Sequence, residues 1–194
     1  HLNTTIQKRI QSTREELSTL GGMPNFFGHQ RFGTKRSITH HVGKALILGN
    51  LEEAALIFLA KPSPYEHSES REARQRLRSE QNWKKALRYF PRILYYERLM
   101  LRHLSRRKGD YAGAFRRLPM KLRELFIQGY QSYLFNRFLS QRMKEGISLN
   151  EAQVGDYVVK VDGYGLLKGE FAQLRSIAKG DRPPLFIGGM DLAI

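Results

Sequence analysis

The segment from Gly21 to Gly33 gathers residue types that suit recognition of a flat, polar ligand. Its residues 24–33, Pro-Asn-Phe-Phe-Gly-His-Gln-Arg-Phe-Gly, set three phenylalanine rings, amide groups and a guanidinium among glycines. A ring face can stack on a nucleic-acid base, an amide can hydrogen-bond to its edge, and glycine permits a close backbone approach. We therefore expect one part of a base-binding pocket here. The alternative interpretation is a loop whose rings fill a core.

A long basic stretch, residues 71–123, is the second feature with chemical meaning. It holds 17 Lys and Arg against four Asp and Glu, so it carries +13 of the formal net charge of +15. Aromatic residues are interleaved with these cations, a composition typical of surfaces that neutralise phosphates and stack on exposed bases. The cations expected to contact a nucleic acid are Arg71, Arg74, Arg78, Lys84, Lys85, Arg88, Arg102, Arg106, Arg107, Lys108, Arg116 and Arg117. Ordinary amphipathic helices with basic, solvated faces are the open alternative.

Several other kinds of site are excluded or disfavoured. The chain of 194 residues has no cysteine, so it has neither a disulfide nor a cysteine-ligated metal. His40 and His41 are adjacent, so on a helix their side chains point about 100° apart and do not bind one metal ion together. Gly163 and Gly165 belong to a hairpin rather than to a strand that leads into a helix, which disfavours a dinucleotide-binding loop. No membrane-spanning segment is expected, because the longest uncharged apolar run is residues 54–60.

Mainly helical elements are expected to position these features. Helical periodicity, capping residues and the breakers Gly and Pro predict helices over residues 4–20, 39–48, 51–60, 70–81, 83–90, 92–106, 110–117 and 120–144. The last of these buries one face, and Gly129 inside it marks a close contact. Residues 21–33 lack a helical period and are expected to be a short strand entering a loop. Alternation after residue 155 predicts a β-hairpin with its turn at Asp162-Gly163.

The sequence resembles the TruD family of tRNA pseudouridine synthases. Residues 24–33 are similar to that family's NxF-G-x-Q-R-F-G signature, and residues 38–47 and 122–142 are similar to its archaeal members. The resemblance implies that a uridine of tRNA, in the D arm at position thirteen, is isomerised to pseudouridine without any cofactor. The uridine must leave its stack for this reaction, so the enzyme needs a ring that replaces the lost stacking.

The resemblance also assigns roles to residues of this chain. Phe27 matches the aromatic residue that packs on the uracil, and Asn25 matches the amide that orients the substrate and the catalytic aspartate. The same wall of the active site is completed by Gly28, Gln30 and Arg31. The helix expected to support this wall carries Gln131, Tyr133, Phe135 and Asn136.

The catalytic aspartate of the family has no expected counterpart in this chain. In the family it lies in a Lys-Asp-x-x-Ala-x-Thr-x-Gln segment before the NxF motif, whereas residues 1–22 contain no aspartate. The aspartates further along lie in the wrong context, and they are Asp110, Asp156, Asp162, Asp181 and Asp191. The chain is therefore expected to be a fragment without a catalytic residue of its own, which binds RNA but does not catalyse alone.

The expected fold class is α+β: a predominantly helical insertion domain with a small antiparallel sheet, attached to part of a pseudouridine synthase catalytic domain. Residues 1–40 are expected to be that part of the catalytic domain, and residues 41–194 the insertion domain that includes the basic helices. The expected partner is tRNA, and the expected location is the cytoplasm, with no metal and no membrane involved.

A stand-alone RNA-binding module without catalysis is the alternative function. A full-length gene product that carries the upstream Lys-Asp segment distinguishes the enzyme from that module. A helical DNA-binding domain fits less well, because nothing in the sequence resembles a helix-turn-helix.

Overall fold

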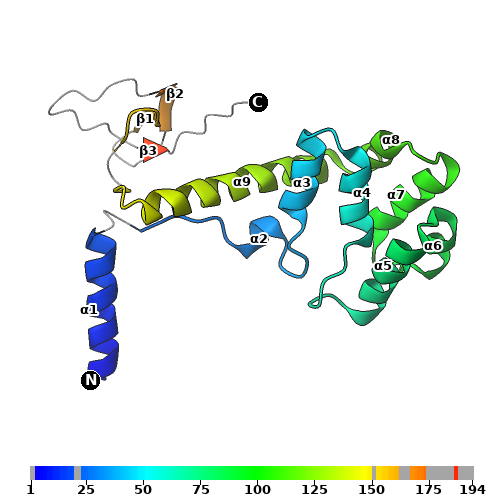
Figure 1. The fold of residues 1–194 in the computed structure, drawn as a ribbon, viewed down its shortest axis with the longest axis horizontal. Helices are drawn as coiled ribbons and strands as arrows, with labels where there is room; N and C mark the ends of the chain where they lie inside the picture. The colour runs from blue at the N-terminus through cyan, green and yellow to red at the C-terminus, as the bar shows by residue number, and fades with distance from the viewer. Residues whose placement is uncertain (1–2, 20–22, 150–151, 162–166, 174–185, 188–194) are drawn as a thin grey trace. The chain divides into compact units, whose positions relative to one another are not determined.

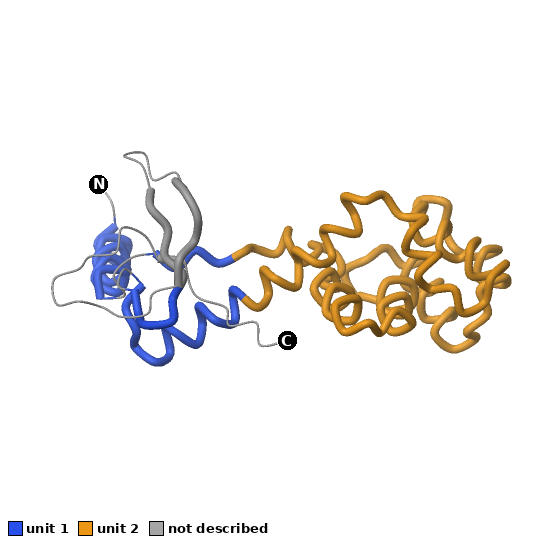
Figure 2. The backbone as a smooth tube through the Cα atoms, turned by 90° about the horizontal axis from the view of Figure 1, so that it is seen from above, with its two compact units in different colours: residues 1–26, 135–194 blue, residues 27–134 orange. Residues whose placement is uncertain are grey.

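The computed structural model describes residues 3–19, 23–149, 152–161, 167–173 and 186–187. Its helices are α1 Thr4–Thr19, α2 His29–Phe32, α3 Thr39–Ile47, α4 Leu51–Ala60, α5 Ser68–Glu80, α6 Trp83–Tyr89, α7 Tyr95–Arg106, α8 Tyr111–Arg116 and α9 Met120–Lys144 (Figure 1). Its strands are β1 Tyr157–Val161, β2 Leu167–Gln173 and β3 Phe186–Ile187. The chain divides into two compact units, one of residues 27–134 and one of residues 1–26 with 135–194 (Figure 2).

Residues 27–134, called the helical unit below, enclose one apolar core. Helix α4 carries a run of small and apolar residues and buries Phe58 and Leu59 at 7% and 0% exposure. Helix α7 adds Met100, and helix α9 adds Phe126, whose ring meets that of Phe58 edge-on with centroids 5.4 Å apart. Burial of such side chains contributes about 1.5–3 kcal/mol each, and this packing holds the short helices that are marginal alone.

Helices α3 and α9 approach each other closely because glycine stands where they meet. A Cβ placed on Gly43 would collide with the backbone carbonyl of Phe126, and a Cβ on Gly129 would lie 2.8 Å from the Thr39 methyl carbon. The close contact predicted at Gly129 is confirmed. It brings the start of α3 against the part of α9 that also contacts Arg31.

Polar caps explain where several basic helices begin. The side-chain oxygen of Asn82 accepts the Lys85 backbone N–H at 2.9 Å at the start of α6. The Asp110 carboxylate does the same for the Gly113 N–H at 2.8 Å at the start of α8. Such caps satisfy backbone donors that a helix leaves unpaired at its first turn.

The other unit holds helix α1, the end of α9 and strands β1 to β3. Helix α1 has no buried residue. Near the end of α9, the buried Arg142 guanidinium donates to the Asp156 carboxylate at 3.1 Å and to the Ser148 carbonyl at 3.1 Å, which fixes the chain that follows the helix. Strand β1 pairs antiparallel with β2 and with β3, in the order β2-β1-β3. The predicted turn at Asp162-Gly163 lies outside the described residues.

The predicted fold class is wrong for the domain that carries the basic helices. That domain was expected to be predominantly helical with a small antiparallel sheet, but the helical unit contains only helices among its described residues. Its core is filled by helix-to-helix contacts, so no sheet stabilises it. The strands lie among residues 157–187, which fall in the other unit. The boundary expected at residue 40 between catalytic and insertion domains stays a prediction.

No helix in the described part of the chain is both long enough and apolar enough to span a bilayer.

Candidate nucleic-acid interface

The motif of residues 24–33 forms an exposed segment followed by one helical turn. Gly28 has extended backbone, φ −78° and ψ 176°, directly before α2, and Gly33 ends this helix with φ +100°. A side chain at Gly33 would collide with the Arg36 carbonyl, whereas nothing lies within 4 Å of a Cβ placed on Gly28. Glycine is therefore required by the fold at position 33, while position 28 borders open space. The described residues 23–33 of this segment form no strand, so the strand expected there is not confirmed. Helix α2 was not predicted because a single turn is too short to show a helical period.

Arg31 links the motif to α9. Its Nε donates to the Ser132 hydroxyl at 3.0 Å, and its Nη1 donates to the Gln128 side-chain oxygen at 3.5 Å. Its guanidinium carbon lies 5.4 Å from the centre of the Phe27 ring, within the range of a cation–π contact. The Ser132 hydroxyl in turn donates to the Gln128 carbonyl at 2.8 Å. Arg31 thus connects the Phe27 ring to helix α9.

The residues expected to form the active-site wall are mostly open to solvent. Asn25, Phe27, Gly28 and Gln30 are exposed, and Arg31 is half-buried. Phe27 is 41% exposed, so its ring is not a core residue of the helical unit. Asn25 belongs to the other compact unit.

Helix α9 contacts the motif through two residues of the helical unit. Within the helical unit the motif contacts Gln128 and Ser132, which the sequence reasoning did not single out. Of the residues it did name, Gln131 is exposed and Tyr133 stacks on His40, while Phe135 and Asn136 fall in the other unit. Ser132 lies one residue from Gln131 and four from Gln128, and the supporting role expected for Gln131, Tyr133, Phe135 and Asn136 stays a prediction.

His40 fills the corner between α3 and α9 with its ring. It stacks on Tyr133 with centroids 4.9 Å apart and meets the edge of Phe32 at 5.2 Å. Burial, with the charges of His41 and Lys61, lowers the pKa of His40 to about 4, so its ring is neutral at pH 7. Among the described residues, no three His, Asp or Glu side chains form a group suited to a metal ion.

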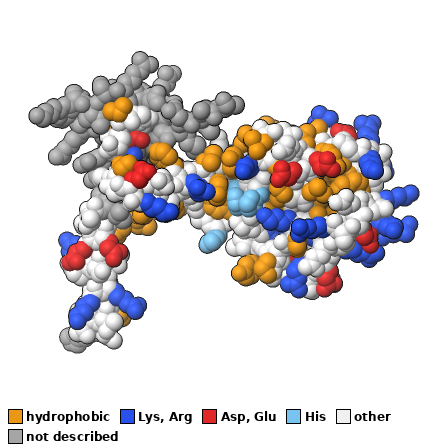
Figure 3. All heavy atoms as spheres, viewed as in Figure 1, with side chains coloured by type: hydrophobic (Ala, Val, Ile, Leu, Met, Phe, Trp, Pro, Cys, Tyr) orange, Lys and Arg blue, Asp and Glu red, His pale blue; other side chains and the backbone are white. Residues whose placement is uncertain are grey.

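The basic stretch places most of its cations on the surface of helices α5–α8 and the segments after α7 and α8. In Figure 3, Lys and Arg side chains gather over the part of the helical unit that holds these helices. Arg71 is half-buried. The exposed members of the predicted set are Arg78, Lys84, Lys85, Arg88, Arg102, Arg106, Arg107, Lys108, Arg116 and Arg117.

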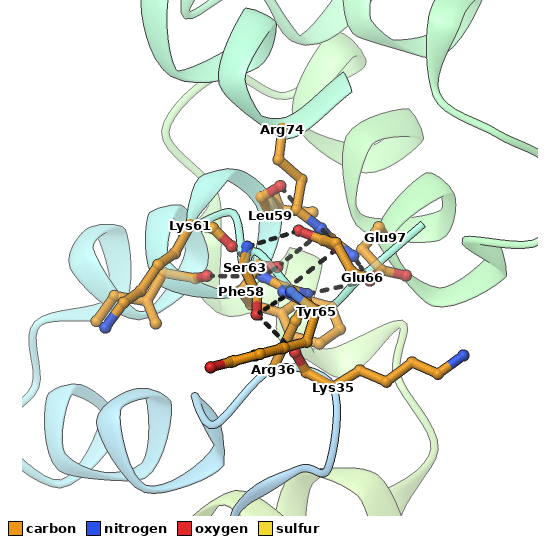
Figure 4. A network of polar contacts seen from close by, with 11 residues as sticks. Lys35, Arg36, Phe58, Leu59, Lys61, Ser63, Tyr65, Glu66, Arg74 and Glu97 are labelled. Carbon is orange, nitrogen blue, oxygen red and sulfur yellow. Dashed lines mark hydrogen bonds and ion pairs between the residues drawn. The ribbon is translucent and has the colours of Figure 1, made fainter. Parts of the chain in front are cut away.

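Arg74 is the exception, because its side chain is buried in a polar network (Figure 4). Its Nη2 donates to the Glu97 carboxylate at 2.6 Å and its Nε to the Glu66 carboxylate at 3.0 Å. Its Nη1 donates to the carbonyls of Phe58 and Leu59, both at 3.1 Å, at the C-terminal end of α4. The residue is 1% exposed, so the expectation that Arg74 contacts a nucleic acid is wrong.

Arg36 completes the same network from the segment before α3. Its Nη2 donates to the carbonyls of Phe58 and Lys61 at 3.0 and 2.8 Å. Its guanidinium also lies 3.8 Å from the Glu66 carboxylate and 3.7 Å from that of Glu97. Burial, and then the charge of Arg74, lower the pKa of Arg36 to about 10, so it remains charged at neutral pH. Two guanidiniums thus cap the negative end of α4 while two carboxylates balance their charge.

Comparison with known proteins identifies what this chain resembles. A family model described as tRNA pseudouridine synthase D (TruD) matches residues 2–179. A curated protein of Methanosarcina barkeri, described as "Probable tRNA pseudouridine synthase D", is 43% identical over 166 residues, which cover 86% of this chain and 38% of that protein. A protein of the same description from Pyrococcus abyssi is 48% identical over 147 residues, which cover 76% of this chain and 36% of that protein.

A solved structure agrees with these sequence matches. The crystal structure of a Methanosarcina mazei protein assigned to tRNA pseudouridine synthase D superposes with a TM-score of 0.80 at 42% identity. The match covers 86% of this chain and 38% of the other. The chain therefore spans less than two fifths of the length of the relatives named here.

Proposed function

Because the chain belongs to the tRNA pseudouridine synthase D family, we propose that it binds tRNA and forms one wall of the uridine pocket of such an enzyme. The whole enzyme would convert a uridine in the D arm of tRNA to pseudouridine, and it would act in the cytoplasm. The reaction breaks the glycosidic C–N bond, turns the uracil and closes a C–C bond, so base and sugar supply every atom of the product. The proposal assigns the catalytic aspartate to another part of that enzyme.

One observation carries the proposal: an exposed ring, held in place, beside open space. Arg31 is fixed to α9 through Ser132 and lies over the Phe27 ring, while Gly28 leaves the neighbouring space empty. A uracil that leaves the RNA stack needs an aromatic face, and a preorganised ring costs little entropy to use. Phe27 would pack on the uracil, with Gly28 and Gln30 bordering the base.

The exposed basic residues supply the second half of the proposal. They lie in the same compact unit as Phe27, and with Arg74 removed the set still holds cations on helices α5–α8 and in the segments after α7 and α8. Contacts to phosphates fix an RNA in place without reading its sequence. We therefore propose that the helical unit binds the backbone of tRNA while the motif receives the uridine.

Salt dependence tests the binding surface. Binding of an unmodified tRNA transcript to the purified chain should weaken by about 0.7–0.9 log units per log unit of salt for each phosphate neutralised. The same chain should form no pseudouridine, since it is assigned no catalytic aspartate. Binding that does not change with salt would favour the alternative that these cations only form basic, solvated helix faces. Pseudouridine formation by the chain alone would refute the assignment of the catalytic aspartate to another part of the enzyme.

Phe27→Ala in the full-length enzyme tests the pocket wall. Turnover should fall strongly while the melting temperature changes little, because the ring is 41% exposed. Phe26→Ala is a matched control, since Phe26 is the preceding residue and is also 41% exposed. Equal losses of turnover in the two variants, or a collapse of stability in Phe27→Ala, would contradict the role given to Phe27.

A further inference from the structure

A pocket of about 340 Å³ lies on the face formed by α7 and the segments after α7 and α8. It is lined by Leu99, Arg102, His103, Arg106, Arg107 and Arg117. Arg102 and Arg106 lie four residues apart on α7, so they share one helical face, and Arg107 follows the end of that helix. Arg117 reaches the pocket from the residue that follows α8. Four arginine residues thus line one pocket.

His103 holds one of these arginines in position. Its Nε2 lies 2.7 Å from the Asp110 carboxylate, and its Nδ1 accepts from Arg117 Nε at 3.4 Å. Because Nδ1 accepts, the ring proton is assigned to Nε2, which donates to Asp110. The Gly113 amide, and then His103, lower the pKa of Asp110, so this residue is a carboxylate at neutral pH. The chain Asp110–His103–Arg117 therefore fixes the Arg117 guanidinium while its two Nη groups remain available.

Three of the four arginines of this pocket have no carboxylate partner in the part of the chain that the structure describes. Across the described residues, neither Arg102, Arg106 nor Arg107 makes an ion pair with a carboxylate. The buried pair Arg36 and Arg74, in contrast, has Glu66 and Glu97 as partners. Guanidiniums brought together without carboxylates repel one another, and an anion with several acceptor oxygens removes that repulsion.

We propose that this pocket binds one phosphate of the RNA backbone and so sets the register of the RNA on the helical unit. The inference rests on the proposed function, since it takes RNA as the partner. Arginine presents paired donors that match the oxygens of a phosphodiester. Phosphate contacts position a protein on a nucleic acid, so one phosphate held in this pocket would determine which phosphates the other exposed cations contact.

Ethylation interference on a tRNA transcript tests the pocket. Ethylating a phosphate removes its charge, so wild-type chain should show one position, or two neighbouring ones, where ethylation weakens binding most. The double variant Arg102→Gln/Arg106→Gln should bind the unmodified transcript about tenfold more weakly per arginine, and ethylation at that position should weaken it no further. The control Arg9→Gln/Arg14→Gln removes the same charge from exposed sites on α1, outside both this pocket and the set of cations proposed to contact RNA, and should keep the wild-type interference pattern.

The outcomes separate the pocket from the proposed function. An interference pattern that is the same in the pocket variant and in wild type would overturn the pocket while tRNA binding stands. Failure of the wild-type chain to bind tRNA would overturn both. A parallel titration with inorganic phosphate distinguishes the source of the anion: saturation of the pocket by free phosphate without any effect on tRNA binding would overturn an RNA phosphate as its occupant, whereas competition supports it.

Discussion

Replacing Arg74 by alanine should destabilise the helical unit far more than replacing an exposed arginine of the same helix. The guanidinium makes four hydrogen bonds, to two carboxylates and to the carbonyls of Phe58 and Leu59. Its removal leaves Glu66 and Glu97 buried with Arg36 as their remaining cation. Because breaking a buried ion pair costs about 3–5 kcal/mol, we expect a loss of about 3 kcal/mol, at the lower end since Arg36 still faces both carboxylates.

Urea unfolding followed by circular dichroism at pH 7 measures this loss. Arg78→Ala is the matched control, because Arg78 is exposed on the same helix and should change the free energy of unfolding by less than about 0.5 kcal/mol. Adding Glu97→Gln to Arg74→Ala should recover part of the loss, since it removes a carboxylate charge left buried.

The same variants separate a structural role from an RNA contact. Arg74→Ala should leave the salt dependence of tRNA binding unchanged, at a temperature where the variant is folded. Arg78→Ala should reduce the salt slope by about 0.7–0.9 if that residue contacts a phosphate. An Arg74→Ala variant that is as stable as Arg78→Ala, or that reduces the salt slope, would contradict the structural role given to Arg74.

Three further predictions concern single positions. Gly43→Ala should lower the free energy of unfolding by about 1–3 kcal/mol in urea titrations, because the new methyl group meets the Phe126 carbonyl, whereas Gly28→Ala should leave it unchanged. His40 should titrate near pH 4 by NMR. Because its pKa is lower in the folded than in the unfolded chain, the unfolded chain binds a proton at a higher pH. The contribution of neutral His40 to stability is therefore present above pH 6.5 and is lost as the pH falls towards 4. His40→Gln should therefore differ from wild type more at pH 7 than at pH 4. Asp110→Ala should lower the stability of the helical unit in thermal or urea unfolding at pH 7, since it removes the cap of α8. The difference from wild type should shrink below pH 3.8, as the carboxylate is protonated.

Helix positions were predictable where strong local signals mark the ends. Helix α4 occupies the expected residues 51–60, and α9 the expected residues 120–144, because Asn50, Pro119 and the glycines nearby interrupt the helical pattern. Helix α2 was not predicted, because a single turn shows no helical periodicity. Alternation did indicate extended chain after residue 155, but it gives no information about which compact unit contains that chain, so the fold class of the helical unit was misjudged.

The candidate site was predictable as a motif but not as a set of contacts. The exposed Phe27 and the basic surface follow from residue types, whereas Ser132 as a partner of Arg31 depends on packing between segments 101 residues apart. Arg74 carried a usable signal. It lies on the face of α5 that also holds Ser70, Ala73 and Leu77, all buried, but the carboxylates that make its burial tolerable come from outside that helix.

The polar network around the end of α4 should also affect the unfolding rate of the helical unit. Its bonds join residues 23 apart between Arg74 and Glu97, and 25 apart between Arg36 and Lys61. Such contacts close long loops, so they should form late in folding, after α4, α5 and α7 have docked. Interactions that are absent from the transition state slow unfolding without slowing folding. The network should therefore slow unfolding, and variants that lack it should unfold faster while they refold at nearly the wild-type rate.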